Sequence, residues 1–108
     1  MSTRKATLLV DSDMDTVTEA GSELKLSMRE RRDMGLTIPA MVKAAKKLKK
    51  AGALSSDPDI AASQILNELI AANPKAFAKP GIDWEGILAF IEKLLPIILK
   101  FISIFGGL

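Results

Sequence analysis

The feature that most constrains this sequence is an apolar run near its C-terminus, DWEGILAFIEKLLPIILKFISIFGGL, which covers residues 83–108. Placed on a helix of 3.6 residues per turn, its polar residues gather in one strip about a third of the circumference wide. The other positions are almost all Trp, Ile, Leu or Phe. An ordinary surface helix has the opposite balance, so the segment predicts a helix with apolar neighbours on most of its sides.

We expect this helix to run from Asp83 to about Phe105. Its predicted apolar face, for contact with other subunits or a membrane, comprises Trp84, Ile87, Leu88, Phe90, Ile91, Leu94, Leu95, Ile98, Phe101, Ile102 and Phe105. Its predicted polar seam comprises Glu85, Glu92, Lys93, Pro96 and Lys100. Because proline removes a backbone hydrogen bond, we expect a kink at Pro96, on the side where water can reach the freed carbonyl.

A helix of this length is long enough to span a bilayer. Glu92, Lys93 and Lys100 would then lie in hydrocarbon, at a cost of about 2.5–3.5 kcal/mol each near the centre. The sequence therefore disfavours a lone membrane-spanning helix. Three interpretations stay open: a central helix of a small bundle, a helix that joins subunits, and a helix that lies in a membrane interface with its seam toward water.

Glycine and proline divide the rest of the chain into an N-terminal arm and three helical segments. Gly35 and Gly52 are expected helix ends, and Asp57 with Pro58 fits the cap and first turn of a helix. The predicted divisions are an arm at 1–10, a helical region at 11–80 with helices at about 13–34, 38–51 and 58–72, and the apolar segment at 81–108. The sequence thus predicts an all-α fold, a bundle of about four helices with an extended arm. The three earlier helices look short of the apolar area needed to cover the last one.

All of the excess positive charge lies in residues 36–52, which hold five lysines and no acidic residue. The predicted basic patch comprises Lys43, Lys46, Lys47, Lys49 and Lys50. A solvated helix face is one interpretation, and contact with the phosphates of nucleic acid or anionic lipid is the other. Sequence-specific nucleic-acid recognition is disfavoured, because the chain has no Tyr, one Trp and no aromatic residue among the lysines.

The chain contains neither Cys nor His, which excludes disulfides, thiolate nucleophiles, imidazole bases and the usual zinc ligands. Asp11, Asp13 and Asp15 have the spacing that begins a calcium loop, but Thr16 and Ser22 replace the required glycine and bidentate acid. Helix capping explains these acids more simply. We find no phosphate-binding or catalytic motif, and expect no catalytic site, metal or cofactor.

These observations predict a non-enzymatic structural protein that acts as a subunit of a larger assembly, either virion-like or membrane-associated. Its expected partners are protein subunits, copies of itself or other chains, bound through the C-terminal helix. The alternative is a peripheral membrane-binding or membrane-perturbing protein, in which that helix inserts and the lysine-rich helix meets anionic lipid. The sequence shows no export signal, so we expect synthesis in the cytoplasm.

Overall fold

The computed structural model describes residues 11–105, with side chains as far as residue 103. In chain order its elements are α2 (Asp11–Glu23), α3 (Met28–Asp33), α4 (Ile38–Lys50), α5 (Pro58–Ala72), the short 3-10 helix η1 (Ala76–Ala78) and α6 (Trp84–Phe105). No strand occurs between residues 11 and 105, and the predicted all-α fold is confirmed. The predicted N-terminal arm, residues 1–10, lies outside the described residues.

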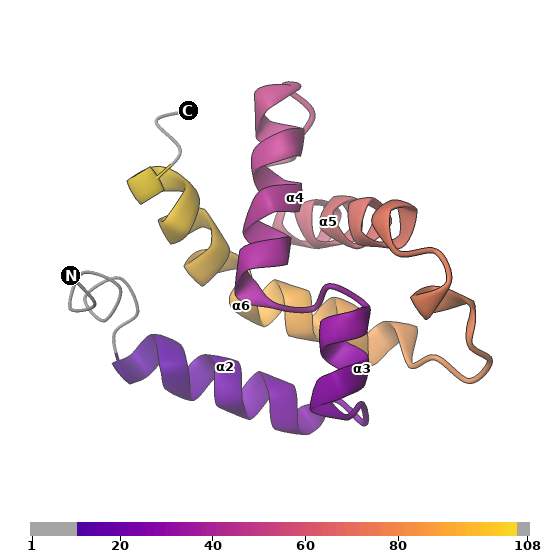
Figure 1. Ribbon diagram of the computed structural model, residues 1–108. Helices are drawn as coiled ribbons and strands as arrows, with labels where there is room; N and C mark the ends of the chain where they lie inside the picture. The colour runs from indigo at the N-terminus through magenta and orange to yellow at the C-terminus, as the bar shows by residue number, and fades with distance from the viewer. Residues whose placement is uncertain (1–10, 106–108) are drawn as a thin grey trace.

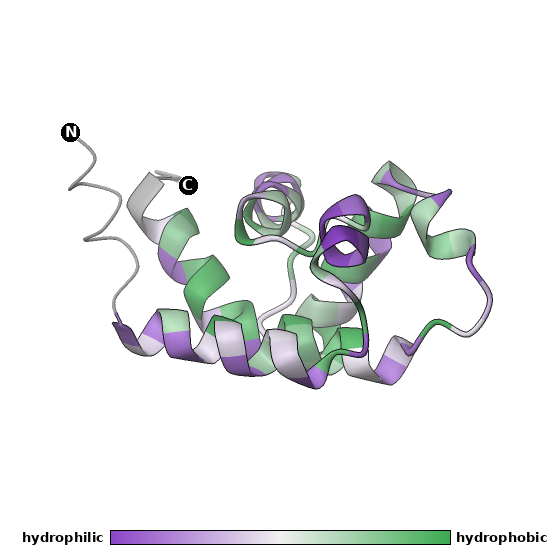
Figure 2. Cartoon of the chain, turned by 60° about the horizontal axis from the view of Figure 1, so that its bottom comes forward, coloured by the Kyte–Doolittle hydropathy of each residue, from purple (hydrophilic) through white to green (hydrophobic). Residues whose placement is uncertain are grey.

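The apolar helix α6 lies at the centre of the fold, with α2, α4 and α5 packed against it (Figure 1). α4 and α5 also contact each other. Figure 2 shows hydrophobic segments along α6 and mixed hydrophobic and hydrophilic segments along α2. The buried residues of α6 are Ile87, Phe90, Ile91, Leu94, Leu95, Ile97, Ile98 and Ile102. Of the three interpretations of this helix, the structure shows the central helix of a small bundle.

Small side chains explain how the other helices cover so much of α6. Ala44 and Ala45 on α4, and Ala61 and Ala62 on α5, are all buried in the core. The distance between packed helices depends on the side chains at the contact, so alanines allow α4 and α5 to approach closely. The expectation that the earlier helices lack the area to cover the last one is therefore wrong for most of α6.

α6 bends along its length, so that its C-terminal part turns away from the line of its N-terminal part (Figure 1). Pro96 lies inside the helix with its side chain exposed. Proline cannot donate the backbone hydrogen bond expected at this position, and its ring crowds the preceding turn. The predicted Pro-kinked C-terminal helix agrees with this shape.

The single helix predicted at residues 13–34 is in fact two helices, because α2 ends at Glu23 and α3 begins at Met28. The Ser27 hydroxyl accepts a hydrogen bond from the Glu30 N–H at 3.1 Å, and the Glu30 carboxylate accepts one from the Ser27 N–H at 3.1 Å. This capping box starts a new helix. The hydrogen bond from the Ser27 backbone is the main reason that the pKa of Glu30 is lowered.

The turn between α3 and α4 sets the direction of α4. Gly35 is buried and has a φ of +76°, a conformation that side chains with a Cβ rarely adopt. The N–H of Leu36 donates to the Arg31 carbonyl at 2.7 Å, and that of Gly35 to the Arg32 carbonyl at 3.0 Å. This Schellman-type end closes α3 and lets α4 cross over α6.

Candidate interaction surface

Most of the predicted apolar face of the C-terminal helix is not a surface. Seven of its eleven residues are buried within the chain itself, namely Ile87, Phe90, Ile91, Leu94, Leu95, Ile98 and Ile102. Leu88 and Phe101 are partly buried, and the side chain of Phe105 lies outside the described part. In this fold the helix as a whole is therefore not available to another subunit or to a membrane.

Trp84, the first residue of α6, is 42% exposed. Its ring stacks on that of the buried Phe77, with ring centroids 5.8 Å apart and an interplanar angle of 15°. Such offset stacking stabilises aromatic pairs beyond the area that they bury. The contact fixes η1 over the start of α6, so a packing role accounts for Trp84.

The predicted polar seam separates into two edges with different neighbours. On one edge, Lys100 forms an ion pair with Asp13 of α2 at 2.7 Å. Lys93 forms a second ion pair, with Glu23 at the other end of α2. Both lysines therefore connect α6 to α2, one at each end of α2, while Glu85 and Pro96 lie exposed elsewhere on the strip.

On the other edge, Glu92 faces the start of α5. Hydrogen bonding of its protonated carboxyl to Asp59, burial and the negative charges of Asp59 and Asp57 raise the pKa of Glu92. The N-terminal end of α5 carries a partial positive charge, which makes nearby carboxylates more tolerable. Across residues 11–103, no group of three or more acidic side chains has the arrangement needed to hold a metal ion.

The lysines of the predicted basic patch all lie on α4 and have different neighbours. Lys47 forms an ion pair with Glu68 of α5 at 3.2 Å, which ties α4 to α5. Lys49 and Lys50 are exposed at the end of α4. Lys43 and Lys46 instead border a hollow between α4 and the C-terminal part of α6. The five lysines thus have different neighbours along α4, and Lys43 also lines a hollow with Lys47 and Glu68.

The structure shows an open apolar groove that the sequence patterns did not predict. A first hollow of about 430 Å³ is lined by Ile38, Pro39, Val42, Lys43, Lys46 and Phe101. A second hollow, of about 320 Å³, is lined by the same Ile38 and Pro39 and by Met14, Val17, Met28, Arg31, Arg32, Leu36, Thr37, Phe90 and Leu94. Because they share two residues, the hollows adjoin. We call them together the α2/α4 groove.

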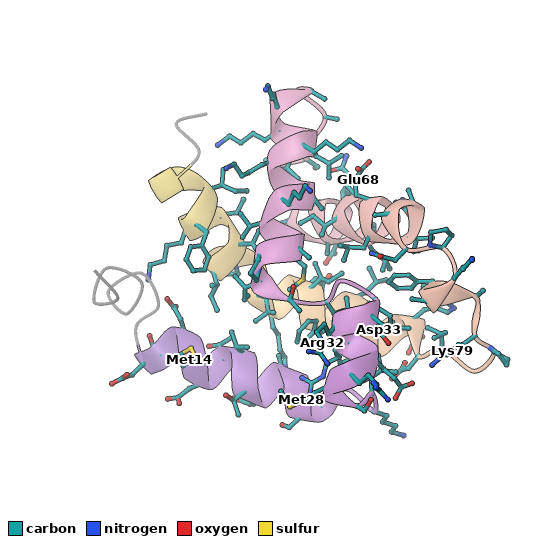
Figure 3. The ribbon with its side chains drawn as sticks, in the orientation of Figure 1. Met14, Met28, Arg32, Asp33, Glu68 and Lys79 are labelled. Atoms are coloured by element: carbon teal, nitrogen blue, oxygen red, sulfur yellow. The ribbon has the colours of Figure 1, made fainter. Side chains whose placement is uncertain are left out.

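The α2/α4 groove has a floor from α6 and walls from α2 with α3 on one side and α4 on the other. Figure 3 shows Met14, Met28 and Arg32 on the side formed by α2 and α3. Met14 is 48% and Met28 80% exposed. Large apolar side chains that are left this exposed around a hollow are typical of binding surfaces.

The charged side chains that line the groove between residues 11 and 103 all have the same sign. Among the described residues, its lining includes four basic side chains and no acidic one; the basic ones are Arg31, Arg32, Lys43 and Lys46. None of these four forms an ion pair with another residue in the described range. The guanidinium of Arg31 lies over Gly21 of α2, where a Cβ would collide with it, and its buried Nε has no hydrogen-bond partner there. The groove is thus apolar and carries positive charges that this part of the chain does not neutralise.

The described helices include none that is long and apolar enough to cross a membrane. Comparison with protein-family models, with curated proteins and with solved structures finds no match to this chain. Any function assigned to the protein therefore depends on the chemistry of its own surfaces.

Proposed function

We propose that the protein is a non-enzymatic structural subunit of a larger assembly, and that it binds a partner protein through the α2/α4 groove. The observation that carries the proposal is the contrast around α6. α6 is buried against α5 and much of α4, yet beside Ile38 and Val42 its partly buried Phe101 borders an open hollow of the groove.

The groove offers a partner enough apolar surface for a specific contact. Val17, Val42 and Phe101 are partly buried along it, and Met28 is largely exposed. Each large apolar side chain that becomes fully buried contributes about 1.5–3 kcal/mol. A few such side chains, together with those of the partner, are the usual centre of a protein interface.

Peripheral membrane binding is the second candidate, and the observation that favours it is the set of lysines beside the groove. Lys43 and Lys46 border it, and Lys49 and Lys50 are exposed farther along α4. Anionic lipid attracts such clusters. However, an interfacial helix inserts a convex apolar face, whereas this surface is concave and the apolar residues of α6 are mostly buried. The geometry therefore favours a protein segment as the occupant.

Site-specific photocrosslinking in the source cells tests the proposal. The crosslinking residue replaces Met28, which lies in the groove, or Ile60, which is 52% exposed on α5 outside it. We expect a discrete protein crosslink from position 28 and none from position 60. The crosslink should disappear when Val42→Lys blocks the groove and persist with the matched change Ile60→Lys.

Equal crosslinking from both positions, or a product that Val42→Lys does not affect, would contradict binding in the groove. Co-sedimentation with vesicles separates the second candidate. If the full chain sediments with anionic vesicles, is released by salt and gives no protein crosslink from position 28, the membrane function replaces the assembly function.

A further inference from the structure

We propose that the segment bound in the α2/α4 groove is an acidic amphipathic α-helix of another protein. Its apolar stripe would lie on the groove floor, and its carboxylates would face the basic side chains on both walls. This inference rests on the proposed function and specifies the chemistry of the partner.

The shape of the groove fits a helix. Its walls are themselves helices, α2 with α3 and α4, and the partly buried Phe101 of α6 lies at its floor, while Phe90 and Leu94 are buried beneath it. The two hollows follow one another and meet at Ile38 and Pro39. An amphipathic helix places anchoring side chains on successive turns, at positions such as i, i+3/i+4 and i+7, so each hollow can take the anchors of one turn.

The distribution of charge selects an acidic helix. Lys43 and Lys46 border one hollow, and Arg31 and Arg32 border the other, so a helix that spans both meets positive charge near each end. Arg31 and Lys46 are partly removed from water. A carboxylate accepts charge-assisted hydrogen bonds from both side-chain types, and a guanidinium can bind it through two parallel bonds.

Other occupants fit less well. A basic helix would bring like charges together at both hollows, and a neutral apolar helix would cover Arg31 and Lys46 without a charged partner, which is unfavourable. Lipid headgroups lie in a plane, whereas these charges come from two helices, α3 and α4, at separate hollows of a concave surface. Charge matching of this kind acts mainly on specificity and on the rate of association.

A displayed library of helical peptides of about 14 residues, four turns, tests the inference. Every member carries Leu, Ile or Met on one stripe, and its flanking positions vary among Asp, Glu, Ser, Gln, Lys and Arg. Selection on the immobilised full chain should enrich Asp and Glu over Lys and Arg at the flanks by about tenfold or more relative to the input.

Charge reversal in the groove supplies the matched control. The double variant Lys43→Glu/Lys46→Glu should lose the acidic preference on the α4 side of the selected peptides. The double variant Lys49→Glu/Lys50→Glu has the same net charge and lies on the same helix outside the groove, so it should keep that preference. Binding of the best acidic peptide, measured by fluorescence anisotropy, should weaken about tenfold in Lys43→Glu/Lys46→Glu and less than about twofold in the control.

Three results would overturn the inference: no enrichment above the bare surface, enrichment of neutral or basic flanks, or an equal loss of acidic preference in both double variants. If one of these occurs while Val42→Lys still abolishes the cellular crosslink, the acidic helix is wrong and the assembly function stands. If Val42→Lys also leaves the cellular crosslink unchanged, both the acidic helix and the proposed assembly function are wrong. Sedimentation with phosphatidylserine vesicles and no peptide enrichment would replace the helix with a lipid surface.

Discussion

α5 and α2 both pack against α6, but different forces hold them there. The buried residues of α5 are Ala61, Ala62, Ile65, Leu66 and Leu69. α2 buries only Ala20 and Gly21, with Val17 packed partly buried against the core, and it also forms the ion pairs Lys93–Glu23 and Lys100–Asp13 with α6. The α5 contact instead brings Glu92 close to Asp59, a pair of like charge. Apolar packing therefore holds α5 despite its charges, whereas α2 combines a smaller apolar contact, which includes Ala20 and the partly buried Val17, with two ion pairs.

This difference matters for the groove, because α2 forms one of its walls and α5 does not line it. Ion pairs at a surface are weakened by salt and contribute little stability each, while apolar burial is insensitive to salt screening. Elements with few buried apolar contacts open at lower free energy than the core. We infer that α2 is the adjustable wall of the α2/α4 groove, supported by a fixed core of α4, α5 and α6.

The largest loss of stability that we expect comes from a substitution in the buried face of α5. Ile65 is fully buried, so Ile65→Ala should lower the free energy of unfolding by about 2–5 kcal/mol, through lost burial and the cavity left behind. Urea unfolding followed by circular dichroism measures the loss. A change well below 1 kcal/mol would show that α5 is not part of the fixed core.

On the α2 side, Val17→Ala should cost about 1 kcal/mol or less, because Val17 is only partly buried. The same urea measurement, expressed per carbon atom removed, compares it with Ile65→Ala. Native-state hydrogen exchange should also show α2 opening before α5 in the unmodified protein. Equal losses of unfolding free energy per carbon atom, or simultaneous opening of α2 and α5, would show that the two helices are held to the core equally well.

The Lys100–Asp13 pair should contribute a small, salt-dependent amount. In a double-mutant cycle of Lys100→Gln and Asp13→Asn, we expect a coupling of about 0.2–1 kcal/mol at low salt, in the range of partly exposed pairs. It should fall toward zero at about 1 M salt, where charges are screened within a few ångströms. A coupling that does not change with salt would argue that the pair acts through packing.

The smallest effect on stability should come from replacing Glu92, and this change should stabilise the fold, whereas the changes above destabilise it. The pKa of Glu92 is raised above its ordinary value of 4.5 by Asp59, so the folded chain binds this proton more tightly than the unfolded chain. Stability from protonation is then present at low pH and is lost as the pH rises through the raised pKa. Glu92→Gln, which is neutral throughout, should unfold at a slightly higher temperature than the parent at pH 7.

That advantage should shrink as the pH falls and vanish well below pH 4.5, where Glu92 is protonated in both the folded and the unfolded state. Thermal unfolding at several pH values measures it. Glu85→Gln, the same change at an exposed position of α6, is the control. A Glu92→Gln variant less stable than the parent at pH 7 would mean that its carboxylate stabilises the start of α5 more than Asp59 repels it.

Local signals in the sequence were sufficient for most of the secondary structure. Asp57 accepts a hydrogen bond from the Asp59 N–H at 2.9 Å and caps α5, with Pro58 in its first turn, as their order in the sequence predicts. The break between α2 and α3 was missed, although Ser27 and Glu30 have the spacing of a capping box. Periodicity alone cannot detect such a break, because the apolar spacing continues across it.

The sequence by itself determined that the chain is helical and that its last helix needs apolar neighbours, because helix periodicity and caps depend on residues a few positions apart. Only the tertiary structure decided that those neighbours belong to the same chain, since this depends on how closely alanines such as Ala45 and Ala62 let helices approach. The groove likewise brings together Met14, Met28 and Phe101, which lie far apart in the sequence. No local pattern encodes such a surface, because it arises from the packing of helices around α6.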